Sequence, residues 1–155
     1  MRTMPILLAA AALVTGVAGC TKAAAPAAHQ DNSKDQPVVR VEVAQSSLGP
    51  ILTDQNGRTL YAFVNDKNGT STCTGDCIAT WPALASRQTP TAGTGADRAL
   101  LSQTSRAEGT AQATYGNWPL YYYVGDVGPG DVDGQGVDGT WFVVGGDGKL
   151  VKTNP

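Results

Sequence analysis

The chain has 155 residues, a formal net charge of −2, three cysteines, two methionines and one histidine. His29, Met1 and Met4 all precede the part that we expect to fold, which argues against zinc hydrolases, blue-copper centres, His- or Met-ligated haem and Ser-His-Asp triads. Lysine and arginine are scattered singly, so we expect no basic stripe for nucleic acid, and we expect no cofactor.

Residues 1–19 have the pattern of a secretory signal peptide. Arg2 precedes an apolar stretch at 5–14, which is too short and too rich in alanine to be read as a membrane span. The small residues that follow end at Cys20 and resemble the bacterial lipobox, in which the peptide is cut before a cysteine that receives a diacylglycerol. The alternative is an ordinary cleavage site with an incidental cysteine. The lipobox interpretation predicts an extracytoplasmic protein whose partner is the cell membrane, through lipid on Cys20.

Residues 20–37 are mostly small and polar, and we interpret them as the acylated cysteine and a flexible tether. A coil of this length would reach about 20–25 Å from the bilayer. Folded sequence is expected over 38–155, a length that fits one small domain.

The first predicted strand is 38–43, where apolar and charged residues alternate and leave one face to be buried. Asn56-Gly57 lies between the apolar runs 48–53 and 58–64. This arrangement predicts a hairpin, because both turn residues accept a positive φ.

Turn residues at 65–69 end this strand, and a short helical turn is predicted near Cys77–Trp81 before Pro82 stops it. Residues 86–97 and 125–139 have the composition of irregular loops. Further short strands are predicted at 98–105, 110–115, 119–124, 141–144 and 149–151.

The segment Leu60–Asp66 returns as Leu120–Asp126, sixty positions later, and the same offset carries Thr80-Trp81 onto Thr140-Trp141. A fixed spacing of shared apolar, aromatic and acidic positions indicates an internal duplication. We place the repeats at about 46–84 and 110–148. The sequence therefore predicts a mainly-β domain, a small antiparallel sandwich or barrel-like fold built from two diverged repeats, with a short helical turn.

The repeated aromatic residues have two interpretations. In a strand, Tyr61 and Phe63 share a face, and Tyr121 and Tyr123 repeat it. Hydrophobic pattern favours a core position for these rings, with hydroxyls bonded at its rim. The alternative is an exposed platform for a sugar or another flat ligand, with further aromatic residues at Trp81, Trp118 and Trp141.

Asp66 and Asp126 end the two copies of the motif and are candidates for a carboxylate pair in glycoside hydrolysis. Each follows a strand and precedes a turn, however, which is where a turn-capping aspartate is found. We therefore expect no catalytic residues, and we do not expect an enzyme.

Cys73 and Cys77 are near neighbours, which outside the cytoplasm favours a disulfide. The loop that it closes is short, so the entropic stabilisation is about 2 kcal/mol. The alternative is a copper or redox site, although the distant histidine that such copper sites usually add is absent.

The stretch that begins at Asp131 resembles the start of a calcium loop, with oxygen donors at alternate positions and a glycine at the sixth. The twelfth position is Phe142 rather than a glutamate. We therefore favour a surface loop and no metal, and keep calcium as a weaker alternative. Its ligands would be Asp131, Asp133, Gln135 and Asp138.

The chain resembles the bacterial secreted-repeat lipoproteins described by a Y-x-[FWY]-x-x-D motif, a family of unknown function. Tyr61-x-Phe63-x-x-Asp66 and Tyr121-x-Tyr123-x-x-Asp126 both match. The flanking matches include Ser71-Thr72-Cys73-x-Gly75-x-Cys77, Trp81-Pro82, Trp118-Pro119-Leu120 and Pro129-Gly130-Asp131. The resemblance covers about 46–148 and implies a signal peptide or lipid anchor and two repeat units, but no catalytic residues.

The function that we expect is a non-enzymatic binding or structural module of the cell envelope, whose partner is an unidentified envelope protein or small ligand. The alternative is an accessory protein in envelope redox or copper handling that uses Cys73 and Cys77.

Overall fold

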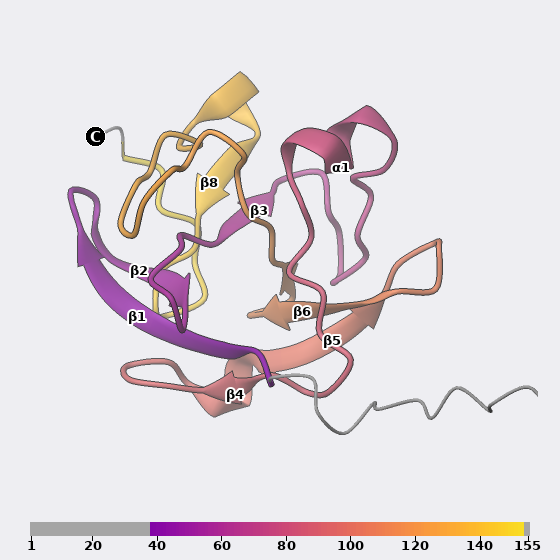
Figure 1. The fold of residues 1–155 in the computed structure, drawn as a ribbon, viewed down its shortest axis with the longest axis horizontal. Coiled ribbons are helices and arrows are strands. Elements are labelled where there is room, and N and C mark those ends of the chain that lie inside the picture. Colours follow the sequence, from indigo (N-terminus) through magenta and orange to yellow (C-terminus); the bar gives the residue numbers. More distant parts are fainter. Residues whose placement is uncertain (1–37, 154–155) are drawn as a thin grey trace, which may run out of the picture. The chain divides into compact units, whose positions relative to one another are not determined.

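The first sheet is built on the strand with alternating valines. In the computed structural model, which describes residues 38–153, β1 (Arg40–Ser46) pairs antiparallel with β2 (Gly49–Asp54) (Figure 1). A two-residue strand, β4 (Thr91–Ala92), pairs with β1 in parallel. Val41 is fully buried and Val39 and Val43 pack against the same cluster, as predicted, but the strand begins at Arg40 and Glu42 is half-buried too.

The predicted signal peptide, Cys20 and the tether lie outside the described residues. Within residues 38–153, no helix has both the length and the apolar character needed to cross a membrane.

A second antiparallel sheet comes from the second repeat. It contains β5 (Leu101–Ser105), β6 (Ala111–Tyr115) and β7 (Trp118–Pro119) in that order. The strands predicted at 98–105 and 110–115 form β5 and β6, which pair with each other, and a 3₁₀ turn, η1 (Arg98–Leu100), precedes them. The turn between β6 and β7 is made by Gly116 and Asn117, both at positive φ, as a tight hairpin requires.

A third sheet joins the two repeats. β3 (Tyr61–Phe63) pairs antiparallel with β8 (Trp141–Val143), and the two strands lie side by side in Figure 1. The expected hairpin between 48–53 and 58–64 forms only at its turn. After the bridge between Thr53 and Thr59, the chain leaves β2 and crosses to the other repeat.

In the equivalent pairing, the second repeat supplies Tyr121–Tyr123 and the first repeat supplies residues 81–83. Ala83 forms a bridge with Tyr121, and Tyr122 N donates to Pro82 O at 2.8 Å. Pro82 occupies the position that Phe142 has in β8, and proline has no N–H to donate. The strand predicted at 119–124 is therefore reduced to β7 and isolated bridges.

Backbone hydrogen bonds repeat about a two-fold relation centred on Tyr61 and Tyr121. Tyr61 N donates to Tyr121 O at 2.8 Å, and Tyr121 N donates to Tyr61 O at 2.9 Å. Val64 N likewise donates to Thr140 O at 2.9 Å, and its counterpart Val124 N donates to Thr80 O at 3.1 Å. Each repeat therefore supplies backbone hydrogen-bond partners to the other.

Short helical elements and turns connect the strands. The predicted helical turn is confirmed as α1 (Asp76–Thr80), and the irregular stretch at 125–139 ends in a 3₁₀ turn, η2 (Val137–Gly139). Of the last two predicted strands, 141–144 forms β8, whereas 149–151 forms only the bridge between Val144 and Leu150.

The buried apolar residues form two clusters. One is mostly aliphatic and includes Val41, Leu52, Leu60, Leu120 and Val144. The other is mostly aromatic and contains Ile51, Tyr61, Cys73, Trp81, Tyr121, Trp141 and Val143. The mainly-β, two-repeat prediction is confirmed, and the sheets formed by the described residues do not close into a barrel.

The β6–β7 turn gives a test of this packing. A Cβ at Gly116 would lie 3.0 Å from Gly148 O and 3.1 Å from Gly148 Cα. At Gly109, also at positive φ, a Cβ would meet no heavy atom within 4 Å. Gly109→Ala is expected to cost about 1 kcal/mol through φ alone, and Gly116→Ala roughly 1–2 kcal/mol more, measured by urea unfolding. Equal costs would contradict the close approach of residue 148.

Candidate ligand-binding site

A cleft of about 430 Å³ opens beside the sheet that joins the two repeats. Its walls come from β3, α1, η2, the start of β8 and Tyr123, so both repeats contribute to it. The lining residues are Phe63, Asn65, Asp76, Cys77, Thr80, Trp81, Tyr123, Val137, Asp138, Thr140 and Trp141.

Four aromatic rings along this cleft form a continuous stack. Phe63 stacks on Trp141 with ring centroids 4.4 Å apart, and Trp141 stacks on Trp81 at 4.0 Å with an angle of 2° between planes. Trp81 then contacts Tyr123 at 4.4 Å. The two ends of the stack, Phe63 and Tyr123, occupy the same position in the two repeats, so the stack follows the two-fold relation of the backbone.

Burial differs along the stack. Trp81 and Trp141 are each 3 % exposed, whereas Phe63 and Tyr123 are half-buried. The inner pair is therefore mainly core, and the outer pair leaves part of its ring surface uncovered in the cleft. Trp118 does not line this cleft; it packs on the aliphatic cluster.

The tyrosines of the motif bond to the aspartates of the opposite repeat. Tyr61 Oη donates to Asp126 Oδ2 at 2.9 Å, and Tyr121 Oη donates to Asp66 Oδ2 at 2.7 Å. Both rings are fully buried and meet the stack edge-on, Tyr61 against Trp81 and Tyr121 against Trp141. Neither aspartate lines the aromatic cleft.

These contacts change the acidity of the paired groups. Burial, followed by the hydrogen bond to Asp66, raises the pKa of Tyr121 to about 12. Burial and the charge of Asp126 raise the pKa of Tyr61 still further. Burial is also the largest cause of the raised pKa of Asp126. Both phenols therefore remain hydrogen-bond donors throughout the physiological pH range.

A polar network, missed by the sequence analysis, continues from Asp66 and Tyr121 into the interior. Ser71 Oγ lies 2.7 Å from Tyr121 Oη and accepts a hydrogen bond from Arg106 Nη1 at 2.6 Å. Arg106 is 5 % exposed, and its Nη2 donates to Cys73 O at 2.7 Å. A lone arginine between turn residues gives no sequence signal of burial.

The predicted disulfide is present. Cys73 and Cys77 are joined with a Cα–Cα distance of 5.3 Å. Cys73 is 1 % exposed, whereas Cys77 is half-buried and lines the cleft. The bond holds the start of α1 against the polar network.

The suggested calcium ligands are engaged in separate contacts. Asp131 Oδ2 accepts hydrogen bonds from the backbone N–H groups of Val127 and Gly128. Gln135 Nε2 donates to Val151 O at 2.7 Å, while Asp138 lines the aromatic cleft. Across residues 38–153, no three His, Cys, Asp or Glu side chains are gathered in a way that could hold a metal.

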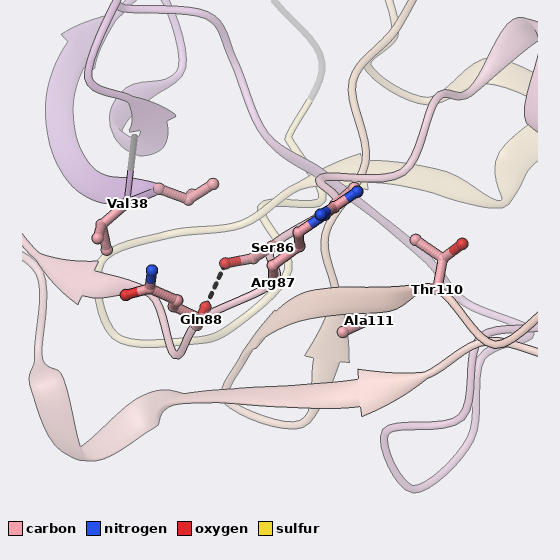
Figure 2. A pocket seen from close by; sticks show the side chains of 8 residues that line it. Val38, Ser86, Arg87, Gln88, Thr110 and Ala111 are labelled. Carbon is pink, nitrogen blue, oxygen red and sulfur yellow. Dashed lines mark hydrogen bonds between the residues drawn. The ribbon is translucent and has the colours of Figure 1, made fainter. Parts of the chain in front are cut away.

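A second pocket of about 280 Å³ lies at the beginning of the described chain (Figure 2). Val38, Ser86, Arg87, Gln88, Thr110 and Ala111 line it, and Ser86 Oγ donates to Gln88 O. Because it has neither an aromatic ring nor a carboxylate, it offers fewer recognition groups than the aromatic cleft.

A family model described as a secreted repeat of unknown function matches the chain twice, over residues 42–85 and 102–145. The two matches contain the two halves of the aromatic stack. The description agrees with the expected extracytoplasmic location. No curated protein and no solved structure matches the chain.

The packing of the aromatic cluster is tested at Gly134. A Cβ there would lie 2.8 Å from the Trp81 ring and 2.9 Å from the Tyr61 ring. In the same loop, a Cβ at Gly128 would have its nearest contact at 3.6 Å. We expect Gly134→Ala to destabilise by about 2–3 kcal/mol and Gly128→Ala by less than about 1 kcal/mol in urea unfolding. A harmless Gly134→Ala would contradict the described packing.

The crossed hydrogen bonds are tested at alkaline pH. The pKa of Tyr121 is about 12 in the folded state and about 10 when unfolded. The protonated phenol therefore makes its full contribution to the free energy of unfolding below pH about 10, and this contribution is lost as the pH rises to about 12. Tyr121→Phe should cost about 1–3 kcal/mol at pH 7, and this cost should fall over that pH window. Tyr123→Phe is the control for loss of a hydroxyl. A pH-independent cost of Tyr121→Phe would contradict the assignment.

Proposed function

This chain belongs to the family of secreted repeats of unknown function, and we propose that it is a non-enzymatic binding module of the cell envelope. In this proposal a lipid on Cys20 holds the module at the membrane, and the aromatic cleft contacts its ligand. The sequence pattern before Cys20 supports the anchor, and the cleft supports the binding role.

The observation that carries the proposal is the meeting of both aromatic motifs in one open cleft. Half-buried rings at Phe63 and Tyr123 provide flat apolar surface, and Asn65, Asp76 and Asp138 provide hydrogen-bonding groups at the rim. Flat rings combined with a few polar groups suit a sugar ring, which has apolar C–H faces and polar edges. We therefore propose a carbohydrate ligand.

The position of the carboxylates supports binding rather than hydrolysis. A glycosidase needs a general acid whose proton is retained by burial, close to a second carboxylate. Asp76 and Asp138, which line the cleft, are both exposed. Asp66 and Asp126 are bonded to the tyrosines instead of facing the cleft.

The redox or copper alternative has weaker support. Cys77 lines the cleft, which would give a thiol partner some access, but Cys73 is 1 % exposed. A copper site would also need both cysteines in the thiolate form.

Binding is tested by calorimetric titration with chitotetraose, a soluble oligosaccharide. We expect Tyr123→Ala and Phe63→Ala to weaken binding about fivefold each, because one ring–ligand stacking contact is worth about 1 kcal/mol. Asp76→Asn, on the exposed rim, removes a negative charge from the cleft with little risk to the fold. Trp118→Ala is the aromatic control outside the cleft and should bind like wild type.

Absence of chitotetraose binding would contradict the carbohydrate proposal. Release of shorter sugars, abolished by Asp66→Asn or Asp126→Asn, would contradict the non-enzymatic proposal.

The cysteine pair is tested separately. Replacing both Cys73 and Cys77 by serine should lower the unfolding free energy by about 2 kcal/mol, because a short loop closure is lost. A variant of normal stability that loses copper binding or disulfide exchange would favour the redox alternative.

A further inference from the structure

The lysines of the described domain gather in one place. Lys67, Lys149 and Lys152 are the three lysines in residues 38–153, and all of them line a groove of about 400 Å³. The other lining residues are Val64, Trp118, Gly148 and Leu150. Both repeats contribute, since Lys67 lies in the first repeat and Trp118 in the second, while Lys149 and Lys152 follow β8.

The groove carries a net positive charge. Lys67 Nζ donates to Val64 O at 3.0 Å, which keeps its charge at the wall. Lys149 Nζ lies 3.2 Å from Asp147 Oδ2, but both side chains are largely exposed, at 83 % and 59 %. Such an exposed pair is screened by water and exchanges readily for another anion. Asp66, in the adjacent pocket, points its carboxylate inward to Thr72 and Tyr121.

The floor of the groove contains an indole ring. Trp118 is half-buried and packs on the aliphatic cluster, as does Leu150. It lies apart from the Trp81–Trp141 stack, and as a half-buried ring it both packs on the core and lines the groove. Tryptophan next to lysine is the combination favoured at the boundary between lipid headgroups and water, because the ring is apolar and the ammonium groups meet phosphate.

We propose that the Trp118 groove binds the headgroup phosphate of an anionic phospholipid and so seats the domain on a membrane surface. Charge complementarity selects this occupant, because three ammonium groups around an apolar floor match a phosphate beside acyl chains. Residues 20–37 provide 18 residues between Cys20 and the described domain. A coil of this length would span about 20–25 Å, so the domain could reach the bilayer to which Cys20 would be attached. The groove is separate from the aromatic cleft, so this proposal does not depend on the carbohydrate ligand, but it rests on the lipid anchor at Cys20 proposed above.

The test uses the processed chain with Cys20→Ser, so that no acyl chain contributes to binding. It is sedimented with vesicles of phosphatidylglycerol and phosphatidylcholine, and with vesicles of phosphatidylcholine alone. We expect binding only to the anionic vesicles, weakened about fivefold by Lys67→Gln, Lys149→Gln or Lys152→Gln and abolished by the triple variant.

A matched triple variant removes the same charge elsewhere. Arg40→Gln, Arg87→Gln and Arg98→Gln replace three exposed arginines outside the groove and should leave vesicle binding within about twofold of wild type. Equal loss in the arginine and lysine triples would show attraction through net charge alone and would overturn the proposal.

Trp118 provides a second measurement. Brominated acyl chains should quench the tryptophan emission of the wild type, and Trp118→Phe should remove most of this quenching because Trp81 and Trp141 are buried. Thermal unfolding checks that each variant is folded. Equal binding to neutral vesicles, unchanged quenching in Trp118→Phe, or binding to soluble polyphosphate without binding to vesicles would overturn the lipid assignment.

Discussion

The reciprocal contact between Tyr61 and Tyr121 is the constraint on which the rest of the structure depends. Their backbones exchange two hydrogen bonds, and their hydroxyls bond to the aspartate of the opposite repeat. Both rings are fully buried, so each hydroxyl must find a partner, and that partner lies in the other half of the chain. One repeat folded alone would bury a phenol and leave an aspartate without its donor. The two halves are therefore one cooperative unit.

The aromatic cleft is a product of this exchange of strands. Because β3 pairs with β8, Phe63 reaches Trp141, and because Tyr121–Tyr123 pairs with residues 81–83, Tyr123 reaches Trp81. The aromatic stack ends at Tyr123 and Phe63, where the rings are less buried. The symmetric packing of the two repeats thus forms both a buried core and, at its edge, the partly exposed rings of the aromatic cleft.

The repeats differ where their environment differs. Around Tyr121, Ser71 and Arg106 connect the hydroxyl to the disulfide-bonded segment. Around Tyr61, the equivalent space is filled by Gly134, whose N–H meets the hydroxyl at 3.2 Å. A symmetric core thus supports loops of different character. The Trp118 groove likewise forms between segments of both repeats, with Lys67 from the first and Trp118 from the second.

Sequence alone determined the features that depend on near neighbours: the alternating strand at 38–43, the turns with glycine and asparagine, the short helix near Cys77, the local disulfide and the duplication itself. It also singled out Tyr61, Asp66, Tyr121 and Asp126, but not their pairing, because the same pattern is compatible with bonds within a repeat or across repeats. Only the tertiary structure decided that the bonds cross, that Arg106 is buried, that Trp118 lies apart from the other tryptophans and that three scattered lysines share one groove. The physical reason is sequence distance: local propensity acts over a few residues, whereas the hydrogen bonds join residues that lie 33 to 65 positions apart, and the groove brings together lysines from distant parts of the chain only when both repeats are packed.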